Sequence, residues 1–97
     1  MEIVILPSAR NDLAKGSTFY ESQEEGLGGY FRESLISDID SLEFYAGIHQ
    51  RVFGFHRLLS GRFPYAIYYS VDSETIFVRA VLDCRRDPKW VRARLKE

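Results

Sequence analysis

The sequence predicts an α+β fold in which a helical hairpin packs on a small, mostly antiparallel sheet and a short helix ends the chain. Two segments, residues 63–71 and 75–82, alternate in hydrophobicity on either side of a polar turn, as the strands of a β-hairpin do. Two earlier segments, residues 9–20 and 31–42, repeat apolar side chains every three or four positions, as amphipathic helices do. The 97 residues are 45% hydrophobic, which is enough for one core, so we expect a single domain over residues 1–97.

The chain is expected to begin with a buried strand and a helix. Ile3 to Leu6 form a short apolar run that Pro7 ends, which favours a buried strand. Ser8 is the expected N-cap of the helix, because a serine hydroxyl accepts a hydrogen bond from an unpaired backbone N–H at a helix start. One face of this helix is apolar at spacings of four, three and four residues, and it consists of Ala9, Leu13, Gly16 and Tyr20.

A second helix should pack against the first as an antiparallel hairpin. Residues 26–29, Gly-Leu-Gly-Gly, end the first helix because glycine readily adopts the positive φ found at helix ends. So short a connection favours antiparallel packing of the two helices. The second helix again has one apolar face, which consists of Phe31, Leu35, Ile39 and Leu42.

Three strands are expected in the second half of the chain. Val52 to Leu59 is rich in aromatic and aliphatic residues and reaches a turn signal at Ser60-Gly61. The hairpin follows, and Pro64 should stand at the start of its first strand, outside the ladder, because proline has no N–H to donate. In the last strand a period of two places four residues on one face, namely Ile76, Val78, Ala80 and Leu82.

A short helix should close the chain. Asp87-Pro88 marks its start, since aspartate caps helix N-termini and proline suits the first turn. Trp90, Val91 and Leu95 are then expected to pack against the rest of the domain. The predicted order of elements is therefore β-α-α-β-β-β, followed by this helix.

Charge is divided unevenly along the chain. Residues 1–48 contain three basic and nine acidic side chains, a net charge of −6, whereas residues 49–97 contain ten and five, a net charge of +5. Such a dipolar molecule steers charged partners. The single cysteine, Cys84, fits a reducing compartment. There is no signal-peptide pattern and no apolar stretch of the roughly 18 residues that a membrane span needs. We therefore expect a cytoplasmic protein without a membrane partner.

Several segments together resemble the RelE/ParE superfamily of toxins from bacterial type II toxin–antitoxin modules. They are Gly26-Leu27-Gly28, the central segment Arg62-Phe63-Pro64-Tyr65-Ala66-Ile67-Tyr68-Tyr69, and Arg85-Arg86-Asp87-Pro88, in the predicted order of elements. The likeness extends from Ala9 to Trp90. It implies a small sheet flanked by a helical hairpin, growth-arresting activity, and neutralisation by a cognate antitoxin.

The superfamily has two kinds of activity, and the resemblance extends to both. One branch cleaves messenger RNA on the ribosome, and such cleavage needs a base, an acid and cations around the phosphate. Arg62 stands where nuclease members carry a functional arginine. Relatives often have histidine, within a Leu-His-Gly-Arg-Arg pattern, where this chain has Asp83, and a carboxylate repels a nearby phosphate. If the chain is a nuclease, the candidate catalytic residues are Arg62, Asp83, Arg85 and His56.

The other branch binds DNA gyrase and poisons it. The resemblance alone does not choose between the two branches, and the lack of an evident acid–base pair favours ParE-like inhibition by protein binding. Three lysines and a net charge of −1 are a weak footprint for ribosomal RNA. The ribosome and messenger RNA remain the alternative targets, and a degenerate, non-toxic member is a third reading. The residues expected to bind target or antitoxin, with the arginines at one edge of the sheet, are Arg57, Arg62, Tyr65, Arg85, Arg86 and Trp90.

No cofactor and no metal are expected. His49 and His56 are the only histidines, and neither has cysteine or carboxylate neighbours at the spacing of zinc ligands.

Overall fold

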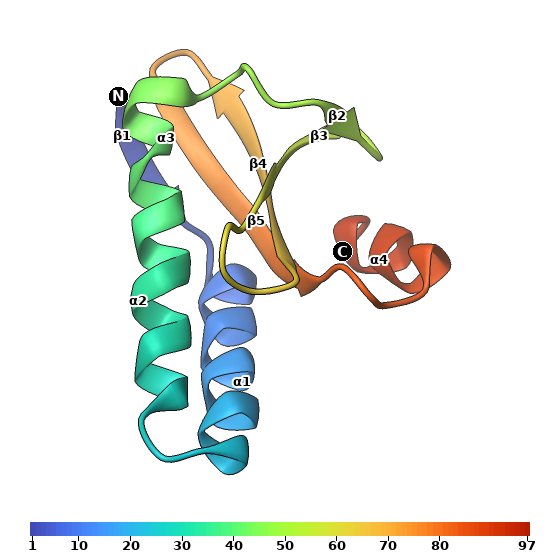
Figure 1. The fold of residues 1–97 in the computed structure, drawn as a ribbon. Helices are drawn as coiled ribbons and strands as arrows, with labels where there is room; N and C mark the ends of the chain where they lie inside the picture. The colour runs from blue at the N-terminus through green and yellow to red at the C-terminus, as the bar shows by residue number, and fades with distance from the viewer.

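The computed structural model describes all 97 residues and confirms the α+β fold class. In chain order the elements are β1 (Glu2–Ile5), α1 (Pro7–Gln23), α2 (Leu27–Asp40), α3 (Leu42–Tyr45), β2 (Arg51–Val52), β3 (Phe55–Leu59), β4 (Tyr65–Asp72), β5 (Thr75–Asp83) and α4 (Pro88–Leu95). The strands form one sheet in the order β1-β5-β4-β3-β2, in which β1 runs parallel to β5 and the other neighbours are antiparallel. Figure 1 shows α1 and α2 side by side, with the sheet between them and α4. No helix combines the length and the apolar character needed to cross a bilayer.

The two long helices approach each other closely because glycine stands at both points of contact. A Cβ built on Gly16 of α1 would lie 2.5 Å from Cζ of Phe31, and one built on Gly28 of α2 would lie 2.5 Å from the carbonyl oxygen of Ser17. At the start of α2, the backbone N–H of Gly28 has no partner within the helix and donates a hydrogen bond to the carboxylate of Glu21 at 2.9 Å. The predicted helical hairpin therefore depends on the absence of side chains at two positions.

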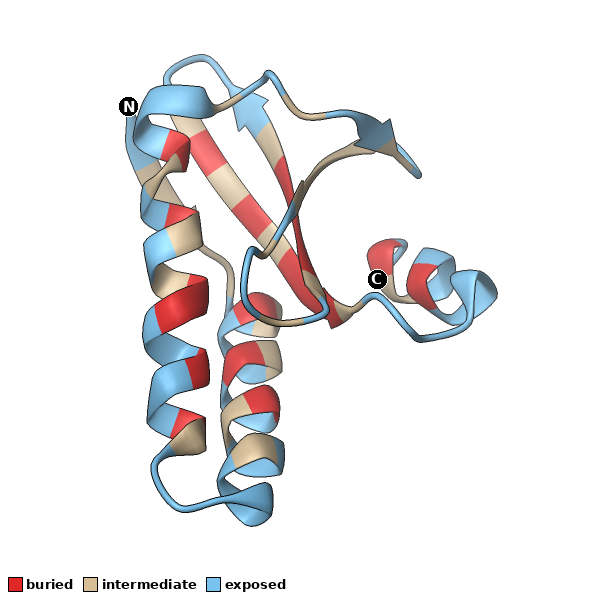
Figure 2. Cartoon of the chain, in the orientation of Figure 1, coloured by how far each residue is buried: buried red, intermediate tan, exposed pale blue.

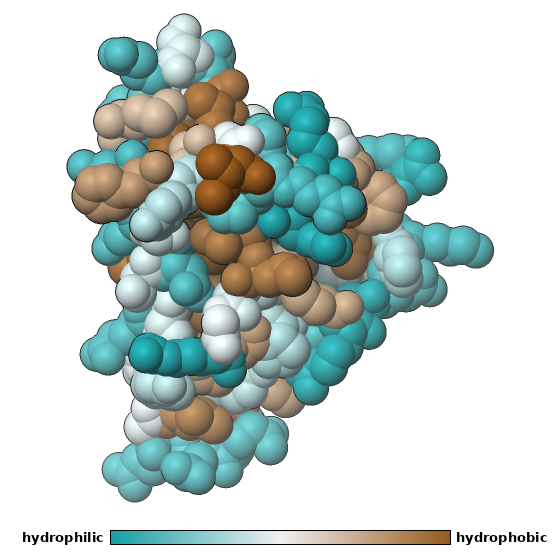
Figure 3. Space-filling model, turned by 45° about the horizontal axis from the view of Figure 1, so that its top comes forward, coloured by the Kyte–Doolittle hydropathy of each residue, from teal (hydrophilic) through white to brown (hydrophobic).

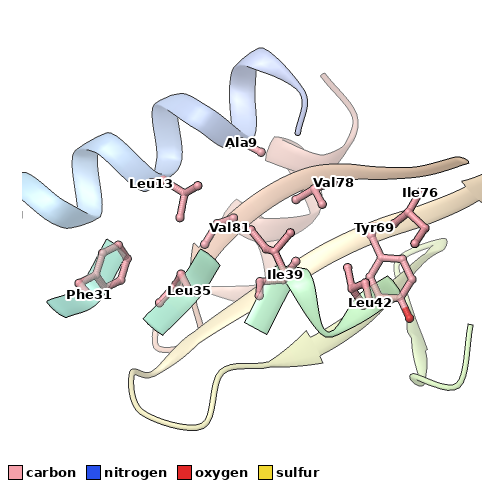
Figure 4. Close-up of a cluster of buried hydrophobic side chains, with 11 residues drawn as sticks. Ala9, Leu13, Phe31, Leu35, Ile39, Leu42, Tyr69, Ile76, Val78 and Val81 are labelled. Atoms are coloured by element: carbon pink, nitrogen blue, oxygen red, sulfur yellow. The ribbon is translucent and has the colours of Figure 1, made fainter. Parts of the chain in front are cut away.

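The larger core lies between this hairpin and the sheet. Figure 2 shows buried residues on the inner sides of the helices and along the central strands, and Figure 4 shows the cluster itself. The apolar faces predicted for both helices are confirmed, although Leu42 belongs to α3 rather than α2. The cluster consists of Ala9, Leu13, Phe31, Leu35, Ile39, Leu42, Ile67, Tyr69, Ile76, Val78 and Val81.

Strand β5 departs from the predicted alternation at Arg79. The pairing register between β4 and β5 skips this residue, which is therefore an extra residue in β5, a β-bulge. Ile76 and Val78, before the bulge, belong to the core under the helices, whereas Ala80 and Leu82, after it, belong to a cluster with α4. The prediction that these four residues share a face is wrong, because one extra residue inverts a period of two.

The face of the sheet opposite the hairpin carries this smaller cluster. Its buried members are Ala66, Tyr68, Ala80, Leu82, Val91 and Leu95. Asp87 caps α4 as predicted, since its carboxylate accepts a hydrogen bond from the Lys89 N–H at 2.8 Å. Val91 and Leu95 are buried as predicted, but Trp90 is 38% exposed.

The predicted strand from Val52 to Leu59 is divided in two. Phe53 and Gly54, with φ of 53° and 87°, form a two-residue turn between β2 and β3. Positive φ at both central residues is typical of the tight turns that match the twist of a hairpin. The sheet consequently has five strands rather than the four predicted.

The predicted cap of the first helix is also wrong. Helix α1 begins at Pro7 with Leu6 as the N-cap residue, because proline suits the first helical position. Ser8 lies inside the helix, and its hydroxyl donates a hydrogen bond to the carbonyl oxygen of Arg79 at 3.0 Å. Pro64 precedes β4 and stays outside the ladder, as predicted.

Candidate functional site

A hollow of about 370 Å³ opens between α1, the end of β5 and α4, and we call it the α1–α4 hollow. Four of the residues predicted to bind or react line it (Tyr65, Asp83, Arg86 and Trp90) and a fifth, Arg85, adjoins it, so it is the candidate functional site. Helix α1 contributes Asp12, Lys15, Gly16 and Phe19, the sheet contributes Tyr65, Val81, Leu82 and Asp83, and the C-terminal segment contributes Arg86, Trp90 and Arg94.

The floor of the hollow is an open edge of the sheet. Strand β1 pairs with β5 only as far as Val78, so the rest of β5 has no strand on that side. Side chains of α1 satisfy part of this edge: the Ser8 hydroxyl donates to the Arg79 carbonyl, and the Asp12 carboxylate accepts from the Val81 N–H, each at 3.0 Å. Beyond these bonds the edge reaches the hollow at Asp83.

An ion pair between Asp12 and Arg94 forms one wall. The nitrogen Nη2 of Arg94 lies 2.7 Å from both carboxylate oxygens of Asp12, and the two side chains are only 10% and 14% exposed. Burial raises the pKa of the Asp12 carboxyl, while the Val81 N–H and the Arg94 guanidinium oppose that rise. The pair therefore fixes α4 against α1 and leaves neither charge free for a ligand.

Asp83 and Arg85 form a second ion pair, at the rim. Arg85 donates from Nη2 and Nε to the two carboxylate oxygens at 2.7 and 3.0 Å, and its backbone N–H adds a bond at 2.8 Å. The Arg85 hydrogen bonds hold the pKa of Asp83 below its ordinary value, and Asp83 in turn raises the pKa of Arg85. Asp83 is thus a stably charged carboxylate, which makes it a weak base.

Arg86 and Lys15 supply the unpaired positive charge of the hollow. The guanidinium carbon of Arg86 lies 3.7 Å from the centroid of the Trp90 ring, a cation–π contact. Neither Arg86 nor Lys15 takes part in either of the two ion pairs of the molecule. Together with the exposed ring of Phe19, they present two cations and aromatic surface to solvent.

Tyr65 joins the hollow to the main core. Its ring centroid lies 4.9 Å from that of Phe31 and 6.2 Å from that of Tyr20, and it lines the hollow. Burial raises the pKa of its hydroxyl. Of the residues predicted to bind a partner, Tyr65, Arg86 and Trp90 therefore meet here, with Arg85 at the rim.

Arg62 lies in a different place from the other predicted residues. It lines a second hollow, which has no residue in common with the first, and its guanidinium carbon lies 5.8 Å from the Tyr30 ring centroid. The buried hydroxyl of Ser34, which has no hydrogen-bond partner, lines the same hollow. The expectation that the arginines share one edge is therefore wrong for Arg62.

His56 and Arg57 lie on β3, away from both hollows. The Nδ1 of His56 lies 2.8 Å from the carbonyl oxygen of His49, and its ring stacks on Tyr69. Arg57 stands opposite Tyr68 in the register, on the sheet face that α4 covers. No three histidine, cysteine, aspartate or glutamate side chains are grouped so as to hold a metal ion.

Sequence reasoning missed the residues that α1 contributes to the hollow. Asp12, Lys15 and Phe19 lie off the apolar face of α1 and were not among the residues expected to bind a partner. Phe19 gave only a weak signal in the sequence, because single exposed apolar side chains are common on protein surfaces. It is 50% exposed at the mouth of the hollow.

Comparison with known proteins supports the fold. No protein-family model matches the sequence, and no curated protein matches it. A solved structure described as "Chromosomal ParDE TA system from P. aeruginosa" is similar, with a TM-score of 0.73, 17% sequence identity, and coverage of 84% of this chain and 92% of that chain. The fold implied by the RelE/ParE resemblance is therefore confirmed.

Proposed function

We propose that this chain is the toxin of a type II toxin–antitoxin module, that a cognate antitoxin binds the α1–α4 hollow, and that the toxin inhibits DNA gyrase by protein binding. The fold similarity to a structure of a ParDE system supports membership of such a module. The observation that carries the choice of mechanism is the separation of the groups that RNA cleavage would need.

The four candidate nuclease residues lie in three places. Asp83 and Arg85 are paired with each other, Arg62 lines the second hollow, and His56 stacks on Tyr69. Cleavage through a ribose hydroxyl requires a base and an acid within hydrogen-bond reach of one phosphate. Asp83 has a lowered pKa and is neutralised by its partner, so it is a poor proton acceptor. This arrangement favours binding over catalysis and needs no cofactor.

The chemistry of the α1–α4 hollow suits an acidic and apolar protein segment. Lys15 and Arg86 offer unpaired positive charge, and Phe19 and Trp90 offer partly exposed rings. Beyond Val81, where the hydrogen bonds to Ser8 and Asp12 end, the edge of β5 has no neighbouring strand, and an extended segment can bond to its backbone there. An antitoxin segment that carries carboxylates beside large apolar residues fits all three features.

Induced expression in bacteria tests the proposal. The wild type should arrest growth and induce the DNA-damage response, and the purified protein should inhibit gyrase supercoiling. Lys15→Ala with Arg86→Ala should abolish the binding of a co-expressed antitoxin from the adjacent gene, whereas Lys89→Ala, an exposed lysine of α4 outside the hollow, should not.

The same cells distinguish the alternatives. Codon-linked cuts in messenger RNA, mapped by primer extension and lost in Arg62→Ala, would establish ribosome-dependent cleavage and refute gyrase inhibition. Normal growth on expression, with full antitoxin binding, would identify a degenerate member that has lost toxicity.

A further inference from the structure

The end of the molecule at which β5 begins, remote from the α1–α4 hollow, exposes large apolar side chains. Phe44, Tyr45 and Ile48 are 79%, 55% and 72% exposed, and they lie within five residues of one another in α3 and the loop after it. Figure 3 turns this end forward and shows hydrophobic side chains open to solvent beside hydrophilic ones. Apolar groups gathered in this way usually mark an interaction site. We call these three residues the α3 patch.

The patch is held in a fixed position. Leu42, in the same turn of helix, is fully buried in the main core, and Ala46 packs against that core. The N–H of Gly47 donates a hydrogen bond to the hydroxyl of the buried Tyr69 at 3.0 Å. One side of the turn is therefore anchored, and the other side presents its rings outward at little further cost in conformational entropy when a partner binds.

Carboxylates surround the patch. Glu43 lies in α3 itself, and α3 packs against β1, whose first residue, Glu2, donates its N–H to the carbonyl oxygen of Glu74 at 3.0 Å. Asp72 ends β4, directly before the β4–β5 turn that contains Glu74. None of these four carboxylates takes part in an ion pair.

Positive charge near these carboxylates is sparse: the ammonium group of Met1 adjoins Glu2, and Arg51 follows Ile48 by three residues. The segments that build this end, residues 1–9, 33–50 and 63–78, contain neither lysine nor arginine. The end is therefore both apolar and negatively charged, and it lacks the positive charges that line the α1–α4 hollow.

We propose that the α3 patch is a second interaction surface, which binds a segment of another protein that carries apolar side chains flanked by lysine or arginine. Apolar anchors would cover Phe44 and Ile48, and the basic side chains would meet the surrounding carboxylates. Two-fold pairing of the patch with a second copy of this chain would bring like charges together, because such an interface repeats the same surface on both sides. An anionic membrane surface would be repelled for the same reason.

Peptide selection tests the proposal without assuming a sequence. Phage-displayed random peptides are first depleted on the variant Phe44→Ser with Ile48→Ser and then selected on the wild type. Recovered peptides should carry net positive charge together with leucine, isoleucine or aromatic residues. The best of them, made synthetically, should shift the amide resonances of α3 and of the β4–β5 turn in the wild type.

Matched variants make the result decisive. The double serine variant should bind that peptide at least about tenfold more weakly than the wild type, and so should the double variant Glu43→Lys with Glu74→Lys. Leu59→Ser, which changes a half-exposed apolar side chain on β3, should bind it like the wild type. Thermal melts show whether each variant is folded.

Three outcomes would overturn the proposal. In the first, selection recovers no peptide, or only neutral or acidic peptides. In the second, the peptide shifts resonances only in the α1–α4 hollow. In the third, the wild type dimerises in sedimentation experiments and the double serine variant does not. Because the surface lies apart from that hollow, each outcome leaves the test of the toxin function unaffected.

Discussion

Asp12 and Arg94 lie 82 positions apart in the sequence, yet Nη2 of Arg94 is 2.7 Å from both carboxylate oxygens of Asp12. The same carboxylate accepts the N–H of Val81 at the open edge of β5. One side chain therefore connects α1, β5 and α4 and sets the shape of the α1–α4 hollow. Water competes little for the pair, since both side chains are largely buried.

Asp12→Ala should destabilise the protein by about 3 kcal/mol. It removes the charged partner of the largely buried Arg94, which keeps only its hydrogen bond to the Ser8 carbonyl, and it leaves the N–H of Val81 without a partner. Arg94→Ala should cost less, since Asp12 keeps its bond to Val81 and can take up a proton. Urea unfolding of both single variants and of the double variant measures the coupling between them. Asp40→Ala, at an exposed position, is the control. A loss no larger in Asp12→Ala than in this control would refute the structural role of the pair.

Gly16→Ala should destabilise the protein, although alanine favours helices over glycine by about 1 kcal/mol. The new Cβ would lie 2.5 Å from Phe31 Cζ, in the centre of the contact between the two long helices, and overpacking of this kind costs about 1–3 kcal/mol. Gly29→Ala is a matched control in α2, where no heavy atom lies within 4 Å of the added Cβ. It should leave stability unchanged or raise it. Equal midpoints of thermal unfolding for the two variants would show that the helices can separate to make room.

The sequence was sufficient to predict the elements whose apolar pattern is regular and local. Leu13 and Phe31 occupy the predicted helix faces, and Asp87 caps α4 as its position before proline suggested. In each case the residues that determine the local structure lie close together in the sequence. The RelE/ParE resemblance then supplied an arrangement of these elements that local pattern alone does not determine.

The errors arose where distant contacts decide the local structure. The alternation around Arg79 has no visible break, but the bulge there aligns the carbonyl of Arg79 with the Ser8 hydroxyl and the N–H of Val81 with Asp12. The α1–α4 hollow likewise depends on contacts between the two ends of the chain. Arg62 looked like a neighbour of Arg86 in a hairpin, yet the two line different hollows, because the loop before β4 folds toward α2.

Asp83 should titrate below its ordinary pKa of 3.8, because Arg85 stabilises the charged carboxylate. A carboxyl whose pKa is lowered by folding stabilises the protein above its unfolded pKa, and that contribution is lost as the pH falls through the folded pKa. The effect is therefore confined to acidic conditions, below about pH 4, and is weakened by salt, since Arg85 is exposed. Carboxyl-carbon NMR should show the Asp83 midpoint rising in Arg85→Ala and staying in place in Lys89→Ala. An unchanged midpoint in Arg85→Ala would mean that the pair is not formed in solution.

The hydroxyl of Tyr69 fastens the loop that follows α3 to the sheet, since it meets both the Gly47 N–H and Nδ1 of His49. Burial, followed by the charge of His56, lowers the pKa of His49 below its ordinary 6.5. A histidine whose pKa is lowered by folding binds its proton more weakly in the native state than in the unfolded state. The free energy of unfolding therefore rises as the pH rises toward 6.5, and this gain is lost in acid.

Tyr69→Phe keeps the buried ring and removes the hydroxyl, so it should cost about 1 kcal/mol for the lost hydrogen bonds. His49→Asn should remove the part of the pH dependence that His49 supplies. Urea unfolding of the wild type and both variants at about pH 5 and about pH 7 measures the two effects. Between about pH 5 and about pH 7 the free energy of unfolding should rise more in the wild type than in His49→Asn, because only the wild type has the His49 proton to lose. Parallel gains in the two proteins would show that His49 titrates normally and that the loop is not held through it.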